Sequence, residues 1–155
     1  MIQIDIPGRR PLQIEHLVLD YNGTIAVDGQ ISEATSALLT QLKDMVKIYI
    51  LTADTYGTAA SQCHHLNVVL KTFPRENAGD SKKEIVADLS GGICCIGNGF
   101  NDISMCQMAD LSIAVLSQEG ICTALVMHCD VLVTSPKDAL SLLLKPDRLR
   151  ATLRN

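Results

Sequence analysis

The chain has 155 residues, of which 47% are hydrophobic and only 3% aromatic, and its formal net charge is -4. This length suffices for one domain, residues 1–155, whose core must be built from aliphatic side chains. The negative charge argues against a general nucleic-acid binder. No apolar run reaches the roughly 18 residues that a membrane-spanning helix needs, so we expect no membrane partner.

The first residues predict a small β element and a cytoplasmic location. Residues 1–12 alternate isoleucines with polar residues until Pro7 and Gly8 break the run, which predicts an edge strand or half of a hairpin. The start lacks the basic end and long apolar stretch of a signal peptide. The six cysteines are expected to be free thiols, because the chain is too long and too apolar for a disulfide scaffold.

The chain is organised around residues 16–20, an apolar run that ends in an aspartate. Such a run, followed at once by an Asn-Gly turn, predicts a buried parallel strand. Asp20 then lies at the carboxyl end of that strand, where open α/β sheets place their chemistry. An Asp-Gly pair at residues 28–29 predicts a small hairpin directly afterwards.

From residue 32 onward, predicted helices and strands alternate, which indicates a central parallel sheet flanked by helices. Further strands are expected at residues 47–51, 67–72, 93–96, 111–116 and 131–133. Helices are expected after Ser32, at 55–66, after a cap at Asp80 or Ser81, and at 101–108, 119–127 and 137–144. Residues 145–155 carry four basic side chains and one acid. This basic tail is predicted to be a last docked helix or, alternatively, a binding arm for acidic partners.

Two later positions suit chemistry at Asp20. Thr52 ends the second predicted strand, and its hydroxyl and the Ala53 amide can hold phosphoryl oxygens. Lys82 is predicted at a helix start, where a cation opposes the helix dipole. Its ammonium is therefore interpreted as the counter-charge of a phosphate, with Lys83 as the competing candidate.

The fourth predicted strand is followed by residues 97–102, Gly-Asn-Gly-Phe-Asn-Asp. The two glycines allow the backbone to pass close to a ligand. Asp102 offers a carboxylate to magnesium, which prefers oxygen ligands. A plain loop with a helix cap is the alternative interpretation of this segment.

Together, in this order, the four segments resemble the motifs of the haloacid dehalogenase superfamily. Within it they are similar to soluble proteins that look like the phosphorylation domain of P-type ATPases. The resemblance implies a three-layer Rossmann-like α/β fold with a small β-flap after the first motif. Between Asp20 and Thr52, and between Thr52 and Lys82, there is no room for a cap domain.

The resemblance also implies a role for each matching residue, with Asp20 as the nucleophile that forms an aspartyl-phosphate. The implied catalytic residues are Asp20, Asn22, Thr52 and Lys82. The implied phosphate-binding residues are Gly23, Thr52, Ala53 and Lys82. The implied Mg²⁺ ligands are Asp20, Asn22, Asn98 and Asp102.

Two positions depart from the pattern of the family. Asn22 stands where its phosphatases carry an acid–base aspartate, and an amide cannot give or take a proton at neutral pH. P-type ATPases have threonine there and preserve the phosphoenzyme, so Asn22 favours their behaviour. Asn98 replaces a magnesium-ligating aspartate, so weaker magnesium binding is expected.

We therefore predict a cytoplasmic, magnesium-dependent, capless phosphohydrolase or phosphotransferase with low activity. Its substrate is expected to be a phosphorylated small molecule or protein, and a homo-oligomer is expected to cover the open site. The alternative is a weak or inactive module that binds phosphate and magnesium or a protein partner, which Asn22 and Asn98 favour. A response-regulator-like receiver fits less well, because receivers need an acidic pair in the first loop.

Overall fold

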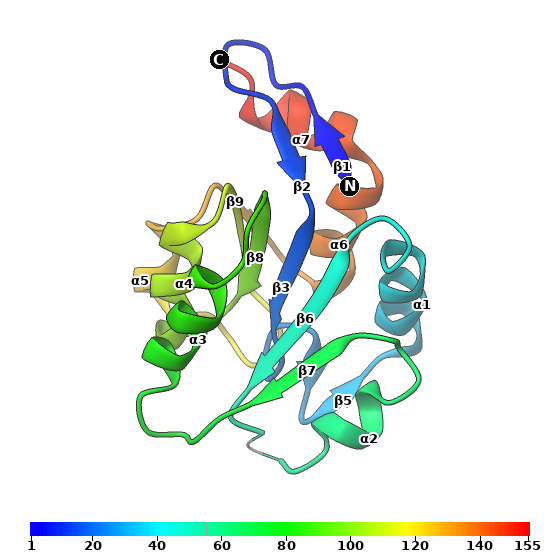
Figure 1. The fold of residues 1–155 in the computed structure, drawn as a ribbon, viewed down its shortest axis with the longest axis vertical. Helices are drawn as coiled ribbons and strands as arrows, with labels where there is room; N and C mark the ends of the chain where they lie inside the picture. The colour runs from blue at the N-terminus through cyan, green and yellow to red at the C-terminus, as the bar shows by residue number, and fades with distance from the viewer. Residues whose placement is uncertain (55) are drawn as a thin grey trace.

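A computed structural model describes residues 1–54 and 56–155 of the chain. At its centre is a six-stranded parallel sheet in the order β10-β9-β8-β3-β6-β7 (Figure 1). Its strands are β3 (His16–Asp20), β6 (Lys47–Thr52), β7 (Val69–Thr72), β8 (Ile93–Gly97), β9 (Leu111–Val115) and β10 (Val131–Val133). Because β3 pairs with both β6 and β8, Asp20 ends a strand in the interior of the sheet.

Helices cover both faces of the sheet, which confirms the predicted three-layer α/β fold. They are α1 (Glu33–Leu42), α2 (Ala59–Cys63), α3 (Ala78–Ala87), α4 (Ile103–Met108), α5 (Thr123–Val126), α6 (Pro136–Leu144) and α7 (Pro146–Leu153). Alternation along β3 divides the core in two. Leu17 and Leu19 belong to one apolar cluster with Leu39 of α1, whereas Val18 belongs to another with Val86 of α3.

Two small antiparallel hairpins accompany the sheet. One pairs β1 (Ile2–Ile4) with β2 (Leu12–Ile14), and the other pairs β4 (Ala26–Val27) with β5 (Gln30–Ile31). The β4–β5 hairpin lies where the sequence predicts one. Its turn residues, Asp28 and Gly29, both have positive φ, as a type I′ turn requires.

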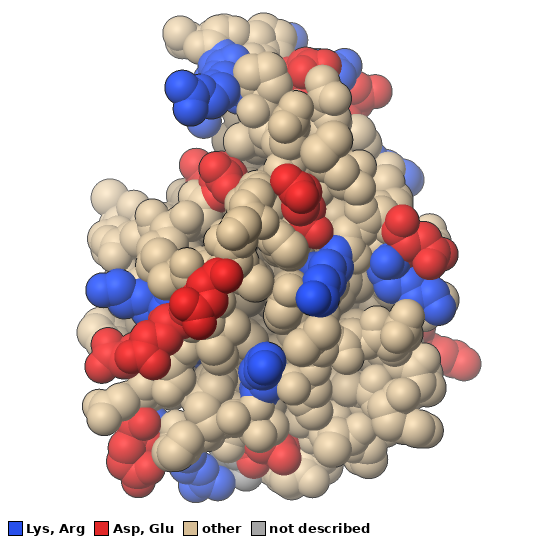
Figure 2. Space-filling model, in the orientation of Figure 1, with Lys and Arg blue, Asp and Glu red and all other residues tan. Residues whose placement is uncertain are grey.

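The C-terminus lies at the top of Figure 1, where the Asn155 amide donates to the Pro7 carbonyl at 3.2 Å, next to the turn between β1 and β2. Helix α7, formed by most of the basic tail, buries Leu149 and Leu153, and its Arg150 donates a hydrogen bond to the Asp5 carbonyl at 2.9 Å. Figure 2 shows acidic and basic side chains interspersed over one face of the molecule. No helix among the described residues is long and apolar enough to cross a membrane.

The structure corrects the predicted start of α3. The helix begins at Ala78, because Asn77 adopts a left-handed conformation with φ 60° and turns the chain into the helix before Asp80 and Ser81. Lys82 is therefore the fifth residue of α3. At this position its charge does not oppose the helix dipole as predicted, since that effect is confined to the first turn.

Two other predicted helices are shorter than expected. In place of the helix predicted at residues 119–127, the structure has only α5, because Gly120 has φ 81° and the backbone of Cys122 is extended. The prediction for residues 55–66 is reduced to α2, and its first residue, Thr55, lies outside the described residues.

Gly92 sits where no side chain fits. A Cβ at this position would lie 1.7 Å from the Gln13 carbonyl oxygen, and the Gly92 carbonyl accepts hydrogen bonds from the amides of Glu15 and His16 at 2.8 and 3.0 Å. We expect Gly92→Ala to lower the free energy of unfolding by about 2–4 kcal/mol, measured by urea denaturation. Gly79→Ala is the control: it meets only ordinary contacts in a helix and should be neutral or slightly stabilising. Equal stability of Gly92→Ala and the wild type would contradict the prediction.

Candidate active site

A pocket of about 240 Å³ opens at the carboxyl ends of the central strands. Its lining residues are Asp20, Asn22, Thr52, Ala53, Lys82, Asn98, Gly99 and Asn101. Six of the eight residues that the sequence implicates are in this lining, and the other two, Gly23 and Asp102, lie outside it. The fold thus brings together the ends of β3, β6 and β8 and the first turns of α3.

Lys82 joins two carboxylates at the base of the pocket. Its Nζ lies 2.6 Å from Asp20 Oδ1, 2.6 Å from Asp102 Oδ1 and 3.1 Å from Asn101 Oδ1. Burial by itself lowers the pKa of Lys82, but the two carboxylates more than reverse this effect, so its pKa lies above the usual value. The ammonium therefore stays charged next to Asp20.

Asp102 lies behind the pocket and is completely buried. Its Oδ1 is bound by Lys82, and its Oδ2 accepts hydrogen bonds from the amides of Asn98 at 3.0 Å and Gly99 at 2.9 Å. Burial, assisted by the charge of Asp20, raises the pKa of Asp102 to about 6. Both oxygens thus have protein partners, and the role of Asp102 as a magnesium ligand stays a prediction.

Thr24 belongs to the site, although none of the predicted site residues is Thr24. Its hydroxyl lies 2.8 Å from Asp20 Oδ2 and 3.1 Å from Asn98 Oδ1, and the residue is fully buried. The amide nitrogen of the Asn98 side chain donates in turn to the Gly120 carbonyl at 3.2 Å. The only signal in the sequence is a threonine four residues after the strand-end aspartate, directly after the turn.

Gly23 contributes by having no side chain. It has φ 77°, and a Cβ there would lie 2.3 Å from the Asn98 side-chain nitrogen. A larger residue would therefore push the Asn98 amide away from Thr24 and Asp20. The structure thus places Gly23 against the side chain of Asn98, and its predicted phosphate-binding role stays a prediction.

Thr52 and Asn22 present groups that have room for a ligand. The Thr52 hydroxyl oxygen accepts a hydrogen bond from the Asp54 amide at 2.8 Å, so its own proton remains available to a pocket occupant. The side-chain oxygen of Asn22 is buried and has no hydrogen-bond partner among the described residues. A ligand or water that donates a proton to this oxygen would satisfy it.

The β4–β5 hairpin, which corresponds to the predicted flap, is fastened to the body. The Gly29 carbonyl accepts hydrogen bonds from the Tyr21 hydroxyl at 2.9 Å and the Thr58 hydroxyl at 2.7 Å. The Asp28 amide donates to the Glu119 carboxylate at 3.1 Å. The hairpin is thus held on two sides.

The oxygen atoms around the pocket can serve as ligands of magnesium when a phosphate is bound with it. In the described parts of the chain, no group of three or more His, Cys, Asp or Glu side chains could hold a metal ion. Such oxygen atoms near the pocket are those of the Asp20 carboxylate, the Asn98 side-chain amide and the backbone carbonyl of Asn22. Magnesium commonly binds through one or two carboxylates together with substrate phosphates and water, so this set is sufficient but carries little negative charge.

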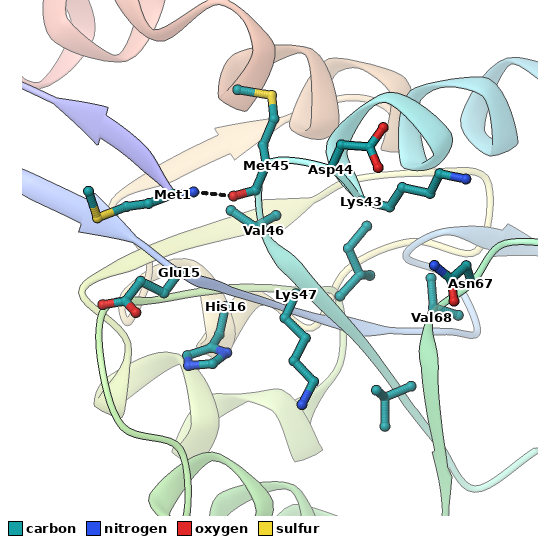
Figure 3. A pocket seen from close by; sticks show the side chains of 12 residues that line it. Met1, Glu15, His16, Lys43, Asp44, Met45, Val46, Lys47, Asn67 and Val68 are labelled. Atoms are coloured by element: carbon teal, nitrogen blue, oxygen red, sulfur yellow. Dashed lines mark hydrogen bonds between the residues drawn. The ribbon is translucent and has the colours of Figure 1, made fainter.

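A larger cavity, of about 570 Å³, lies at the opposite end of the sheet (Figure 3). Glu15, His16 and Lys47 line it where β3 and β6 begin. His16 Nδ1 is buried and has no hydrogen-bond partner among the described residues. Since none of the residues implicated by the sequence lines this cavity, we place the candidate active site in the smaller pocket.

Comparison with known proteins gives one family relationship. No family model matches the chain. An uncharacterized protein of Methanocaldococcus jannaschii is 43% identical over 87 residues, which cover 56% of this chain and 82% of that protein. A copper-exporting P-type ATPase of Staphylococcus saprophyticus is 27% identical over 119 residues, 74% of this chain but only 15% of the ATPase. The chain belongs to the family of the Methanocaldococcus protein.

Solved structures identify the fold. The 3-deoxy-D-manno-octulosonate 8-phosphate phosphatase of Moraxella catarrhalis, crystallised with magnesium, phosphate and its sugar, superposes with a TM-score of 0.71 and 16% identity over 91% of this chain and 94% of that one. A candidate HAD family hydrolase of Streptomyces avermitilis superposes with a TM-score of 0.67 and 15% identity, over 86% of this chain and 84% of that one. The chain therefore has the capless haloacid dehalogenase-like fold, and the predicted resemblance is confirmed at the level of the fold.

The raised pKa of Asp102 has a consequence for stability. The folded protein holds the Asp102 proton with a pKa of about 6, against an ordinary value of 3.8, so the folded state binds this proton more tightly than the unfolded chain. Its contribution to stability is therefore present at low pH and is lost as the pH rises through about 6. We expect the wild type to lose stability relative to Asp102→Asn over this range in urea denaturation.

Asp147→Asn is the control, because Asp147 is exposed on α7. Its stability should follow that of the wild type in parallel across the same pH range. Parallel curves for the wild type and Asp102→Asn would contradict the prediction.

Proposed function

We propose that the protein is a phosphohydrolase or phosphotransferase that acts through an aspartyl-phosphate on Asp20. The observation that carries this proposal is the Asp20 carboxylate 2.6 Å from the Lys82 ammonium, in a pocket also lined by Thr52. Phosphoryl transfer to a carboxylate requires this combination of a nucleophile, a cation and hydrogen-bond donors.

Two displacements at phosphorus complete the reaction. In the first, an Asp20 oxygen attacks phosphorus, the bond to the leaving oxygen breaks, and the leaving group departs with the electron pair. In the second, water attacks phosphorus and the bond to Asp20 breaks, which releases inorganic phosphate and restores the carboxylate. Lys82, the Thr52 hydroxyl and the Ala53 amide hold the phosphoryl oxygens in both steps.

Magnesium would be held by the Asp20 carboxylate, the backbone carbonyl of Asn22 and the side-chain oxygen of Asn98. When bound, it supplies further positive charge to the phosphoryl oxygens. The magnesium and phosphate in the Moraxella phosphatase crystals support this assignment. Asp102 serves as a positioning residue that fixes Lys82 and the loop after β8 from behind.

Asn22 determines how fast the cycle runs. Its unpartnered oxygen can accept a hydrogen bond from the attacking water, but an amide cannot take the proton. The second displacement is therefore slow, and alkoxide leaving groups depart poorly because no acid is available to protonate them.

A second candidate function is a regulatory or protein-interaction module that binds phosphate without turnover. It is favoured by the two asparagines, because Asn22 removes the proton carrier and Asn98 removes a negative charge from the magnesium donors. Retention of the Asp20–Lys82–Asp102 cluster does not discriminate between the two functions, since binding phosphate uses the same cation.

Replacement of Asn22 tests the enzymatic proposal. Asn22→Asp supplies a proton carrier of nearly the same size, so steady-state turnover of a nitrophenyl phosphate should rise by about 10-fold or more. The wild type should show a burst followed by slow turnover, and the variant should hold a shorter-lived phosphoenzyme in acid-quench labelling.

Two controls accompany this measurement. Asp20→Asn should abolish labelling, and Asn67→Asp, which adds the same charge outside the pocket, should behave as the wild type. If the wild type and Asn22→Asp both show neither burst nor turnover, the enzymatic proposal is wrong and the binding module remains.

Replacement of Asn98 tests the metal assignment without any assay of activity. Asn98→Asp places a second carboxylate near Asp20 and removes the hydrogen bond to the Gly120 carbonyl. We expect a lower melting temperature in chelator, and a larger rise on addition of magnesium than the wild type shows, because the metal relieves the carboxylate repulsion. An equal magnesium response in both proteins would place the metal elsewhere, and Asn67→Asp again controls for the added charge.

A further inference from the structure

A second pocket, of about 260 Å³, adjoins the candidate active site. We call it the Phe100 pocket, and its lining residues are Asn77, Gly79, Asp80, Phe100, Asn101, Ile103 and Ser104. It lies between the first turn of α3 and the segment that joins β8 to α4.

Asn101 separates the two pockets and lines both of them. Its side-chain oxygen accepts a hydrogen bond from Lys82 at 3.1 Å, on the active-site side. Its backbone lies against Gly79, where a Cβ would come within 3.5 Å of the Asn101 carbonyl oxygen. The Phe100 pocket therefore lies on the other side of Asn101 from the place beside Lys82 where a phosphate would be bound.

The apolar part of this pocket is Phe100 together with Ile103. Phe100 is 74% exposed, in a chain whose aromatic content is only 3%, and it stands between Gly99 and Asn101, two residues of the active-site lining. Its short helical turn is fixed by the Gly99 amide, which donates to Asp102 Oδ2. The ring is thus presented at a defined place beside the site, within a concavity that can receive a ligand.

The charge of the Phe100 pocket narrows the choice of ligand. No lysine or arginine is among its lining residues, and Asp80 supplies the one carboxylate. A second phosphate or a carboxylate on the bound group would be repelled there. A neutral or cationic ring would not be repelled by the Asp80 carboxylate.

We infer that the Phe100 pocket receives the leaving group of the substrate and that this group is an aromatic ring joined to the phosphate through its oxygen. The inference rests on the proposed function and adds the substrate class. Asn22 supports it independently: an aryl oxide departs without a proton, so a site that lacks an acid suits an aryl phosphate and not a sugar phosphate. Packing of the substrate ring on Phe100 favours aromatic over small aliphatic leaving groups.

Calorimetric binding of two non-hydrolysable probes, benzylphosphonate and methylphosphonate, tests the inference in the presence of magnesium; the CH2 group of benzylphosphonate stands in for the bridging oxygen. The wild type should bind benzylphosphonate about 5- to 10-fold more tightly than methylphosphonate. Phe100→Ala should lose this preference and keep the methylphosphonate affinity, whereas Phe100→Tyr should retain both. Because Phe100 is exposed, urea denaturation should show unchanged stability in the two variants.

Leu132→Ala is the matched control, because Leu132 is an exposed apolar residue on the edge strand β10, and it should leave both affinities unchanged. Equal binding of the two probes by the wild type, or a phenyl preference that survives in Phe100→Ala, overturns the inference and leaves the proposed function intact. Failure of the wild type to bind either probe overturns the phosphate site, and the inference with it.

Discussion

The architecture of the site depends on one buried ammonium between two carboxylates. Lys82, Asp20 and Asp102 are each at least nine-tenths buried, and removing charges from water is costly unless they are paired and hydrogen-bonded. One cation cannot neutralise two acids, and burial, together with the charge of Asp20, raises the pKa of Asp102. This cluster ties α3 to the ends of β3 and β8, so the elements that build the pocket are also those that its charges hold together.

A second layer of contacts positions the opposite wall of the pocket. The Thr24 hydroxyl lies between Asp20 and Asn98, and Gly23 leaves the space that the Asn98 side chain needs. The Asn98 side chain accepts a hydrogen bond from Thr24 and donates one to the Gly120 carbonyl, which an ionised carboxylate at this position could not do, and it carries no charge. A site of this kind retains the means to orient a phosphate while its attraction for a divalent cation is reduced.

Fold and chemistry rest on different observations in this protein. The likeness to solved phosphatases, at 11–16% identity, identifies the fold, and folds of this kind host more than one function. The proposed reaction instead rests on the residues in the pocket, and the proposed substrate class on two features of them. In this proposal Asn22 limits the leaving groups that can depart, and the Phe100 pocket offers apolar side chains and a single carboxylate beside the place where such a group would lie.

The sequence by itself determined the strand that ends in Asp20, the Asp-Gly hairpin and six residues of the pocket lining. The strand and the hairpin follow from local rules, namely a short apolar run that ends at a turn and an Asp-Gly pair, whereas the resemblance to a known family pointed to most of the lining residues. Only the tertiary structure decided that Asp102 lies behind Lys82, that Thr24 touches Asp20, and that Phe100 flanks the site. The positions of Asp102 and Phe100 depend on distances between segments far apart in the chain, which are set by how α3 and the loop after β8 pack on the sheet. The contact between Thr24 and Asp20 depends on how the turn after β3 folds back.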